Sequence, residues 1–203
     1  MSMLDLLDYR RRVTQMYRLI RESDDPLSAW QLFRRTRDEL FQSHPQSPLD
    51  DMQKAAFSGL RYYDYDPAYR VIAAVDPRAK PETLEYELGE DGLLRCTRVA
   101  RVNVTLPTGT GTLSLFWING YGGGLFLPFG DTTNRQTTYG AGRYLYDTIK
   151  GADLGASLTE IVLDFNFAYN PSCAYNPRWI CPLAPPENRL PFPVPAGEMN
   201  FSE

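Results

Sequence analysis

The last 33 residues of this 203-residue chain hold eight of its 16 prolines, and no other feature limits the possible folds as strongly. Proline has a fixed φ and lacks a backbone N–H, so such a segment is excluded from the interior of a helix or a sheet. It nevertheless carries large apolar side chains that a disordered tail would rarely contain. We therefore expect residues 171–198 to form an ordered, extended wrap over the body of the protein, anchored by Trp179, Leu183 and Phe192.

The first 60 residues have the periodicity of helices. Apolar side chains recur at the spacing of one helical face in two stretches, namely Val13, Met16, Tyr17 and Ile20, and then Trp30, Phe33, Leu40 and Phe41. Ser28 and Ser47 are the predicted N-caps of the second and third helices, because a serine side chain can accept a hydrogen bond from a free backbone N–H.

From about residue 69 the pattern becomes that of β-strands. Alternating or β-rich runs occupy residues 69–75, 83–88, 93–106, 110–118, 125–129 and 161–167. Strands this closely spaced favour an antiparallel sheet or barrel. We therefore predict an α+β fold of mainly antiparallel β structure, a twisted sheet or barrel. The N-terminal helical segment (residues 1–60) packs on a β-rich domain with the C-terminal wrap (residues 61–203), and the two form one structural unit.

Charge and hydropathy argue against several classes of partner. The net charge is -4, whereas a nucleic-acid-binding surface needs an excess of Lys and Arg. No apolar run approaches the roughly 20 residues of a membrane span, and the N-terminus lacks the apolar core of a signal peptide. We therefore expect a cytoplasmic protein without nucleic-acid or membrane partners. The Gly-rich residues 120–124 lack the Lys-Ser/Thr ending of a phosphate-binding loop, and we expect no cofactor.

Polar side chains are unusually frequent between residues 131 and 198. Arg143 directly follows the segment Gly140-Ala-Gly142, and glycines allow another backbone to approach closely. Asp164 and Asn166 are two apart on a predicted strand, so they share one face and point to solvent or into a cavity. The polar residues of this stretch are Asp131, Tyr139, Arg143, Asp164, Asn166, Asn170, Asn188, Arg189 and Glu198, and all except Asn170 are candidate site residues.

Two interpretations of this set remain open. In the first, Arg143 forms a buried ion pair that holds the wrap in place, with Asp164 as the first expected partner and Asp131 or Glu198 next. In the second, Arg143 is the bidentate donor of a pocket for an anionic or polar ligand, to which the other polar side chains contribute.

The thiols and the only histidine form a second candidate group. Cys173 and Cys181 have prolines beside them, and we expect the resulting turns to bring the two thiols within reach of a disulfide. Reducing cytoplasmic conditions favour free thiols. We expect no metal, because zinc sites use shorter Cys spacings and Cys96 and His44 are the only further ligands of their kind. His44 lies in a loop, where it serves either in packing or in a catalytic Cys–His pair.

The order of motifs resembles a known family. It runs from Thr138-Tyr-Gly-Ala-Gly-Arg-Tyr-Leu145 through Leu163-Asp-Phe-Asn-Phe-Ala-Tyr-Asn-Pro171, Cys173-Ala-Tyr-Asn176 and Cys181-Pro-Leu183 to Pro185-Pro-Glu-Asn-Arg-Leu190 and Ala196-Gly-Glu198. Over most of its length the chain is similar to the bacterial and archaeal domain of unknown function 1684 family. The resemblance implies no established activity.

Three functions are compatible with these residues. The favoured hypothesis is a module that binds a small polar or anionic ligand in a pocket around Arg143 and Asp164, beneath the wrap. The alternative is a metal-independent hydrolase or lyase with Asp164 or Glu198 as general base and Arg143 as charge stabiliser. The third is a non-catalytic structural or interaction domain. An enzyme would require a carboxylate with a raised pKa in a concave site, whereas a binding module requires only a preformed pocket.

Overall fold

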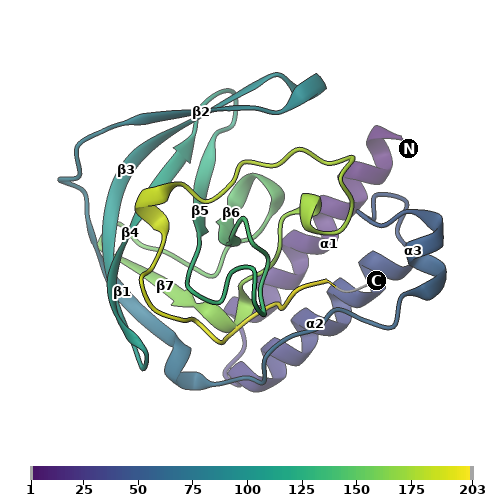
Figure 1. The fold of residues 1–203 in the computed structure, drawn as a ribbon, viewed down its shortest axis with the longest axis horizontal. Coiled ribbons are helices and arrows are strands. Elements are labelled where there is room, and N and C mark those ends of the chain that lie inside the picture. The colour runs from purple at the N-terminus through teal and green to yellow at the C-terminus, as the bar shows by residue number, and fades with distance from the viewer. Residues whose placement is uncertain (1, 202–203) are drawn as a thin grey trace.

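The computed structural model describes residues 2–201 and shows two long helices packed beside a curled sheet (Figure 1). Helix α1 (Met3–Arg21) contacts α2 (Pro26–Ser43), and the short α3 (Asp51–Ala56) follows. The buried side chains confirm the predicted faces: Met16, Tyr17 and Ile20 in α1, and Trp30, Phe33, Leu40 and Phe41 in α2. Within residues 2–201, no helix combines the length and the apolar character that crossing a membrane requires.

The predicted N-caps are wrong by three residues each. Helix α2 is capped by Asp25 with Pro26 at the first helical position, and α3 is capped by Asp50. An aspartate combines a hydrogen-bond acceptor with a negative charge at the positive end of the helix. Ser28 lies inside the first turn, where its hydroxyl donates to the Asp25 carboxylate at 2.6 Å. The buried Ser47 hydroxyl donates instead to a backbone carbonyl near the end of α2.

One antiparallel sheet of seven strands has the order β6-β5-β4-β3-β1-β7, with β2 paired to β3 off this path. It curls into a half-barrel (Figure 1), which confirms the predicted α+β fold. The strands are β1 (Arg70–Asp76), β2 (Thr83–Glu87), β3 (Leu93–Leu106), β4 (Gly109–Ile118), β5 (Gly124–Phe129), β6 (Arg143–Asp147) and β7 (Glu160–Asp164). Strand β6 is not among the predicted runs. Strand β7 ends at Asp164, and residues 165–167 form a 3-10 helix.

The long strand β3 produces much of the curl. Its pairing with β4 shifts register between Arg98 and Ala100, so that one extra residue bulges from the ladder. Before the bulge β3 also pairs with β2, and after it with β1. A bulge bends a strand and increases its twist. The inward residues Val102, Val104 and Leu106 therefore turn toward the helices and join the core cluster that contains Tyr17 and Phe33.

The C-terminal wrap crosses the open side of the half-barrel and ends beside α2 (Figure 1). Bridges join Gly130 to Arg189 and Tyr62 to Glu198, so the wrap is tied to the body at several points. Its side chains alternate, with Leu190, Phe192, Val194 and Ala196 buried and Pro191 and Pro193 exposed.

The predicted anchors of the wrap are partly correct. Phe192 is buried, and the half-buried Trp179 donates from Nε1 to the Pro48 carbonyl at 3.0 Å. Leu183 is 42% exposed, so its assignment as an anchor is wrong. Its neighbours Pro182 and Ala184 face inward, and in an extended chain the residue between them points outward.

Candidate functional site

Arg143 begins β6 and is 0% exposed. Its guanidinium donates to the Asp131 carboxylate at 3.0 Å and to three carbonyls of the wrap: Val194 at 3.0 Å, Glu198 at 3.2 Å, and Ala196. Burial lowers the pKa of Arg143, and the Asp131 carboxylate opposes that change. The prediction of a carboxylate partner is confirmed. Arg143 joins β6 to the wrap and has no exposed surface to offer a ligand.

The first expected partner of Arg143, Asp164, lies elsewhere. The strand register places Asp164 opposite Arg70 on β1, and Arg70 Nε lies 3.8 Å from Asp164 Oδ2. The backbone and side-chain amides of Asn166 both donate to Asp164 Oδ1, at 3.1 Å and 2.8 Å. Because the chain turns into a 3-10 helix after Asp164, these two side chains do not share a strand face. Asp164 lines a cavity, whereas Asn166 is buried against the Asp66 backbone.

Other predicted site residues also bond within the protein. Asn188 Oδ1 accepts the Ser114 N–H at 2.7 Å, and its Nδ2 donates to the Ser114 and Pro128 carbonyls. Asp131 Oδ1 accepts the Val194 N–H at 3.1 Å. The exposed Arg189 donates to the Ala184 carbonyl, five residues earlier in the wrap, at 3.4 Å. The structure thus places Asp131 at Arg143 and leaves Asn188 and Arg189 on other contacts.

Glu198 is 1% exposed. Its backbone carbonyl accepts a hydrogen bond from Arg143, whereas its side-chain carboxylate contacts a separate group of residues. Its Oε2 accepts Arg37 Nη2 at 2.7 Å and the Asn170 N–H at 3.0 Å, and its Oε1 accepts the Tyr175 hydroxyl. Burial raises the pKa of Glu198, and the Arg37 guanidinium opposes this. Arg37 also donates from Nε to the Tyr62 hydroxyl at 2.8 Å. These contacts leave both oxygens of Glu198 hydrogen-bonded.

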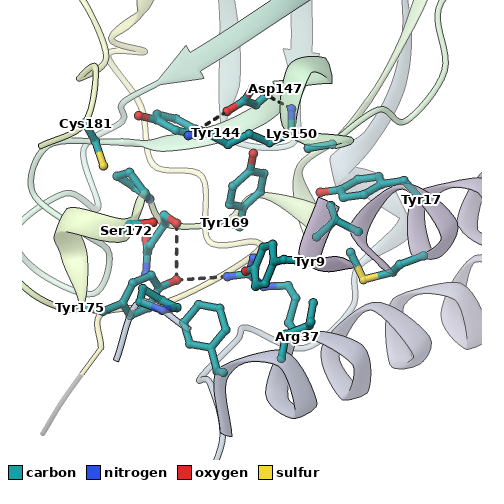
Figure 2. Close-up of a pocket in the computed structure, with 18 residues that line it drawn as sticks. Tyr9, Tyr17, Arg37, Tyr144, Asp147, Lys150, Tyr169, Ser172, Tyr175 and Cys181 are labelled. Atoms are coloured by element: carbon teal, nitrogen blue, oxygen red, sulfur yellow. Dashed lines mark hydrogen bonds and ion pairs between the residues drawn. The ribbon is translucent and has the colours of Figure 1, made fainter. Parts of the chain in front are cut away.

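A cavity of about 100 Å³ lies next to this cluster (Figure 2). It is enclosed by α1, α2, β6 and residues 169–181, and we call it the tyrosine-lined cavity. Apolar side chains such as Met16, Leu40 and Phe41 form part of its wall. Its five tyrosines are Tyr9, Tyr17, Tyr144, Tyr169 and Tyr175.

Both cationic side chains of the tyrosine-lined cavity already have carboxylate partners. Arg37 is paired with Glu198, and Lys150 Nζ lies 3.5 Å from Asp147 Oδ2 (Figure 2). The Asp147 carboxylate raises the pKa of Lys150. The Lys150 side chain is 60% exposed and marks the outer side of the cavity. The wall is therefore polar, but its charges are balanced.

Two residues that line this cavity each carry a buried polar atom without a hydrogen-bond partner within the protein: Tyr17, through its hydroxyl, and Asn170, through Oδ1. Tyr17 is 1% exposed and Asn170 3% exposed. Figure 2 shows the Tyr17 side chain reaching from α1 toward Tyr169. Burial raises the pKa of Tyr17, so its hydroxyl stays protonated at neutral pH and can donate a hydrogen bond.

Asp164 lines a separate cavity of about 340 Å³ between α1, the start of α2, β1 and β7. Arg21 and Arg70 lie at this cavity, and Ile20 and Phe167 are among its apolar lining residues. Burial raises the pKa of Asp164 to about 6, while the hydrogen bonds from Asn166 oppose the change. This is the environment that the enzyme hypothesis requires of a general base, a carboxylate with a raised pKa in a concave site.

The two thiols predicted to be neighbours are in contact. The Cys173 N–H donates to Cys181 Sγ at 3.4 Å, and the Tyr139 hydroxyl lies 3.5 Å from Cys173 Sγ. Both cysteines are half-buried, and no disulfide joins them in the structure. Among residues 2–201 no three His, Cys, Asp or Glu side chains are grouped so that they could hold a metal ion.

His44 is not placed for a Cys–His pair. Its Nδ1 accepts the Gln46 N–H at 3.0 Å and its Nε2 lies 3.2 Å from Asp8 Oδ2, so both ring nitrogens are engaged at the end of α2. The ring also packs edge-on against Tyr9, with 5.2 Å between the ring centroids. These contacts describe a packing and capping residue.

Arg37 is the site residue that sequence reasoning missed. It lies four residues after Phe33 and four before Phe41, on the apolar face of α2. A charged residue in the middle of an apolar helical face is buried and therefore paired. The position of Arg37 between Phe33 and Phe41 could thus have identified it from the sequence. The cavity tyrosines come from distant parts of the chain and share no such local pattern.

Comparison with known proteins places the chain in a family. Residues 55–199 match the family described as "Protein of unknown function (DUF1684)". The solution NMR structure of an uncharacterised protein from Haloarcula marismortui is 35% identical, with a TM-score of 0.61, and the match covers 85% of this chain and 92% of that one. No curated protein matches the chain. The chain belongs to the DUF1684 family, as its motifs predicted.

Proposed function

We propose that the protein binds a small, uncharged, polar molecule in the tyrosine-lined cavity. The observation that carries this proposal is the pair of unpartnered groups, the Tyr17 hydroxyl and Asn170 Oδ1, on the wall of one cavity. Buried polar groups have partners in nearly all native structures, so two such groups together call for a partner that the chain does not supply. A ligand with a donor satisfies Asn170 Oδ1, and the Tyr17 hydroxyl can donate or accept.

Charge favours an uncharged ligand over an anion. An anion would have to compete with Glu198 for Arg37, and breaking that buried ion pair is costly. At the exposed Lys150 ammonium it would have to compete with the Asp147 carboxylate. Volume restricts the ligand to a few non-hydrogen atoms, since a dry cavity of about 150 Å³ holds one benzene. The ligand class is therefore narrower than the polar or anionic molecule expected from the sequence, and its site lies away from the Arg143 guanidinium.

Acetamide is a suitable first probe, because it is small and carries both a donor and an acceptor. At no more than about 1.5 kcal/mol for each of its four non-hydrogen atoms, its Kd should be no lower than about 40 μM, so the titration extends into the millimolar range. We expect saturable NMR shifts in α1 and residues 169–181 on titration of ¹⁵N-labelled protein. Inorganic phosphate should give none at these residues. Shifts with phosphate alone would contradict the choice of an uncharged ligand.

A matched pair of variants tests the role of the Tyr17 hydroxyl. Tyr17→Phe should weaken acetamide binding about three- to tenfold, the effect of one hydrogen bond, without lowering protein stability. Tyr65→Phe is the control, because the Tyr65 hydroxyl is likewise buried and unpartnered but Tyr65 does not line this cavity. Equal affinities of the two variants for acetamide would show that the Tyr17 hydroxyl does not contact the ligand.

A second candidate function rests on Asp164. Its raised pKa and its place in the 340 Å³ cavity suit a general base in a metal-independent hydrolase or lyase. A panel of p-nitrophenyl esters tests for hydrolysis. We expect a rate that rises through pH 6 in the wild type and is lost in Asp164→Asn. A rate that Asp164→Asn leaves unchanged would remove this candidate.

A further inference from the structure

Cys173 and Cys181 lie together in the first part of the wrap, where the chain is half-buried. The Cys173 N–H donates to Cys181 Sγ at 3.4 Å, so the loop between them closes on itself. Tyr139 approaches from the β5–β6 connection and lies with its hydroxyl 3.5 Å from Cys173 Sγ. The third thiol of the chain, Cys96, is 0% exposed within β3. The structure thus separates two accessible, adjacent thiols from one enclosed thiol.

The surroundings make the two thiols of the pair unequal. A thiolate at Cys173 accepts hydrogen bonds from the Cys181 thiol and the Tyr139 hydroxyl, which lowers the pKa of Cys173 to about 6. The same contact with Cys173 raises the pKa of Cys181. Burial raises the pKa of Cys96 to about 11. Because the thiolate is the reactive form, Cys173 is the nucleophile of the pair at neutral pH.

Two other roles for the pair lack the necessary partners. A structural zinc site needs four ligands, and no third His, Cys, Asp or Glu joins these thiols among the described residues. A thiol hydrolase needs a base beside its nucleophile, and both ring nitrogens of His44 are engaged elsewhere. A nucleophilic thiol with a second thiol in contact is the arrangement used in thiol–disulfide exchange.

We propose that Cys173 and Cys181 form an exchange site for small organic disulfides, with Cys173 as the attacking thiol and Cys181 as the resolving thiol. The Cys173 thiolate attacks one sulfur of a disulfide RSSR, the S–S bond breaks, and RS⁻ leaves and takes up a proton. Cys181 then loses its proton and attacks Cys173 Sγ. A Cys173–Cys181 disulfide forms and the second RSH leaves, so that two protein thiols are oxidised while one RSSR is reduced to two thiols.

The site adjoins the tyrosine-lined cavity but does not depend on its ligand. Cys181 is one of the lining residues, so closing the disulfide alters one wall group. The exchange itself requires only the two thiols and the disulfide substrate. Its failure would leave the proposed ligand binding standing, and the converse also holds.

Glutathione disulfide is the test substrate, and the mass of the intact protein is the readout. We expect the reduced wild-type protein to lose two hydrogens and retain no glutathione. Cys181→Ser should stop at a mixed disulfide carrying one glutathione. Cys173→Ser should react at least tenfold more slowly at pH 7, and Cys96→Ser, which removes the enclosed thiol, should react like the wild type. The wild-type rate should be half-maximal near pH 6, in contrast to about 8.5 for an unperturbed thiol.

Either of two outcomes would overturn the proposal. One is accumulation of a glutathione adduct on the wild-type protein without ring closure, which would show that Cys181 does not resolve it. The other is a Cys173→Ser variant that reacts as fast as the wild type. Circular dichroism of each variant verifies folding. The pH dependence and product of the wild-type reaction provide a test that needs no substitution.

Discussion

Glu198 connects two of the buried arginines, Arg37 and Arg143. Its backbone carbonyl accepts a hydrogen bond from Arg143 at 3.2 Å, and its carboxylate accepts one from Arg37 at 2.7 Å. Arg143 belongs to β6 and Arg37 to α2, so a single residue of the wrap joins the sheet to the helices. Desolvated charges are tolerated when they are paired and hydrogen-bonded in this way, which makes each member of the network sensitive to substitution.

Replacing Arg143 by methionine is expected to destabilise the protein severely. Arg143→Met leaves the Asp131 carboxylate buried without its partner, and breaking a buried pair in this way lowers the free energy of unfolding by about 3–5 kcal/mol. Urea denaturation followed by fluorescence measures the loss. Arg95→Met, which breaks the exposed pair with Glu85, is the control and should have little effect. Similar losses in the two variants would show that the Arg143 network is not structural.

The raised pKa of Asp164 predicts how stability depends on pH. The pKa of Asp164 is about 6 in the folded protein, against an ordinary value of 3.8. Between these pH values the folded state keeps a proton that the unfolded state releases. The Asp164 contribution to the free energy of unfolding therefore falls as pH rises from about 4 to 6, and is constant above that.

Asp164→Asn removes this contribution. The free energy of unfolding of the variant, minus that of the wild type, should rise by up to about 3 kcal/mol between pH 4 and pH 7. Urea titrations of both proteins at pH 4, 5, 6 and 7 measure this difference. The contributions of the other titratable groups cancel, because the two proteins share them. A difference that is the same at every pH would mean that the pKa of Asp164 is ordinary.

The sequence predicts some of these side-chain contacts but not others. That Arg143 needs a carboxylate follows from its glycine neighbours and the nearby acids. Whether Asp131 or Asp164 lies beside Arg143 depends on how the strands pair, which local sequence does not show. In the folded chain, Asp164 lies opposite Arg70 at the end of β7, and Asp131 lies beside Arg143. Arg37 could have been found, because its position on an apolar helical face is visible in the sequence.

Among the elements, the wrap behaves like an additional extended strand whose alternate side chains complete the core. Leu190 is 3% exposed and Leu183 42% exposed, although both lie in the same proline-rich segment. Leu190→Ala should lower the free energy of unfolding by about 2–5 kcal/mol, because it removes buried methyl groups and leaves a cavity. Leu183→Ala should change it by no more than about 0.5 kcal/mol. Thermal or urea unfolding distinguishes the two, and equal effects would contradict the packing of the wrap.

The elements differ in how well local sequence predicts them. The helices were predictable because one face of each is apolar at helical spacing, and the wrap was predictable because proline excludes the alternatives. Strand β6 was not predictable from alternation, because all five of its residues are buried. A strand covered on both faces shows no polar–apolar alternation. The two N-cap predictions were wrong because each chose a serine that lies within a few residues of an aspartate. The aspartate is the cap in both helices, and its negative charge is favourable at a helix N-terminus.

At the scale of the whole molecule, the candidate site arises where segments far apart in the chain meet. Helices α1 and α2, strand β6 and residues 169–181 each supply part of the tyrosine-lined cavity. No local pattern encodes an enclosure built from segments as distant as Tyr9 and Cys181. The sequence predicted a pocket beneath the wrap, but placed it around Arg143. The wrap fills that place with its own carbonyls, and the cavity lies instead beside Arg37, the partner of the Glu198 carboxylate.

A crystal structure of the protein soaked in acetamide is the decisive test of the ligand site. We predict electron density for one acetamide in the tyrosine-lined cavity, within hydrogen-bond distance of both Tyr17 Oη and Asn170 Oδ1. The density should disappear in crystals of Tyr17→Phe soaked at the same concentration and persist in Tyr65→Phe. A cavity that holds only water at saturating acetamide, with those two groups satisfied by the water, would contradict the proposed ligand site.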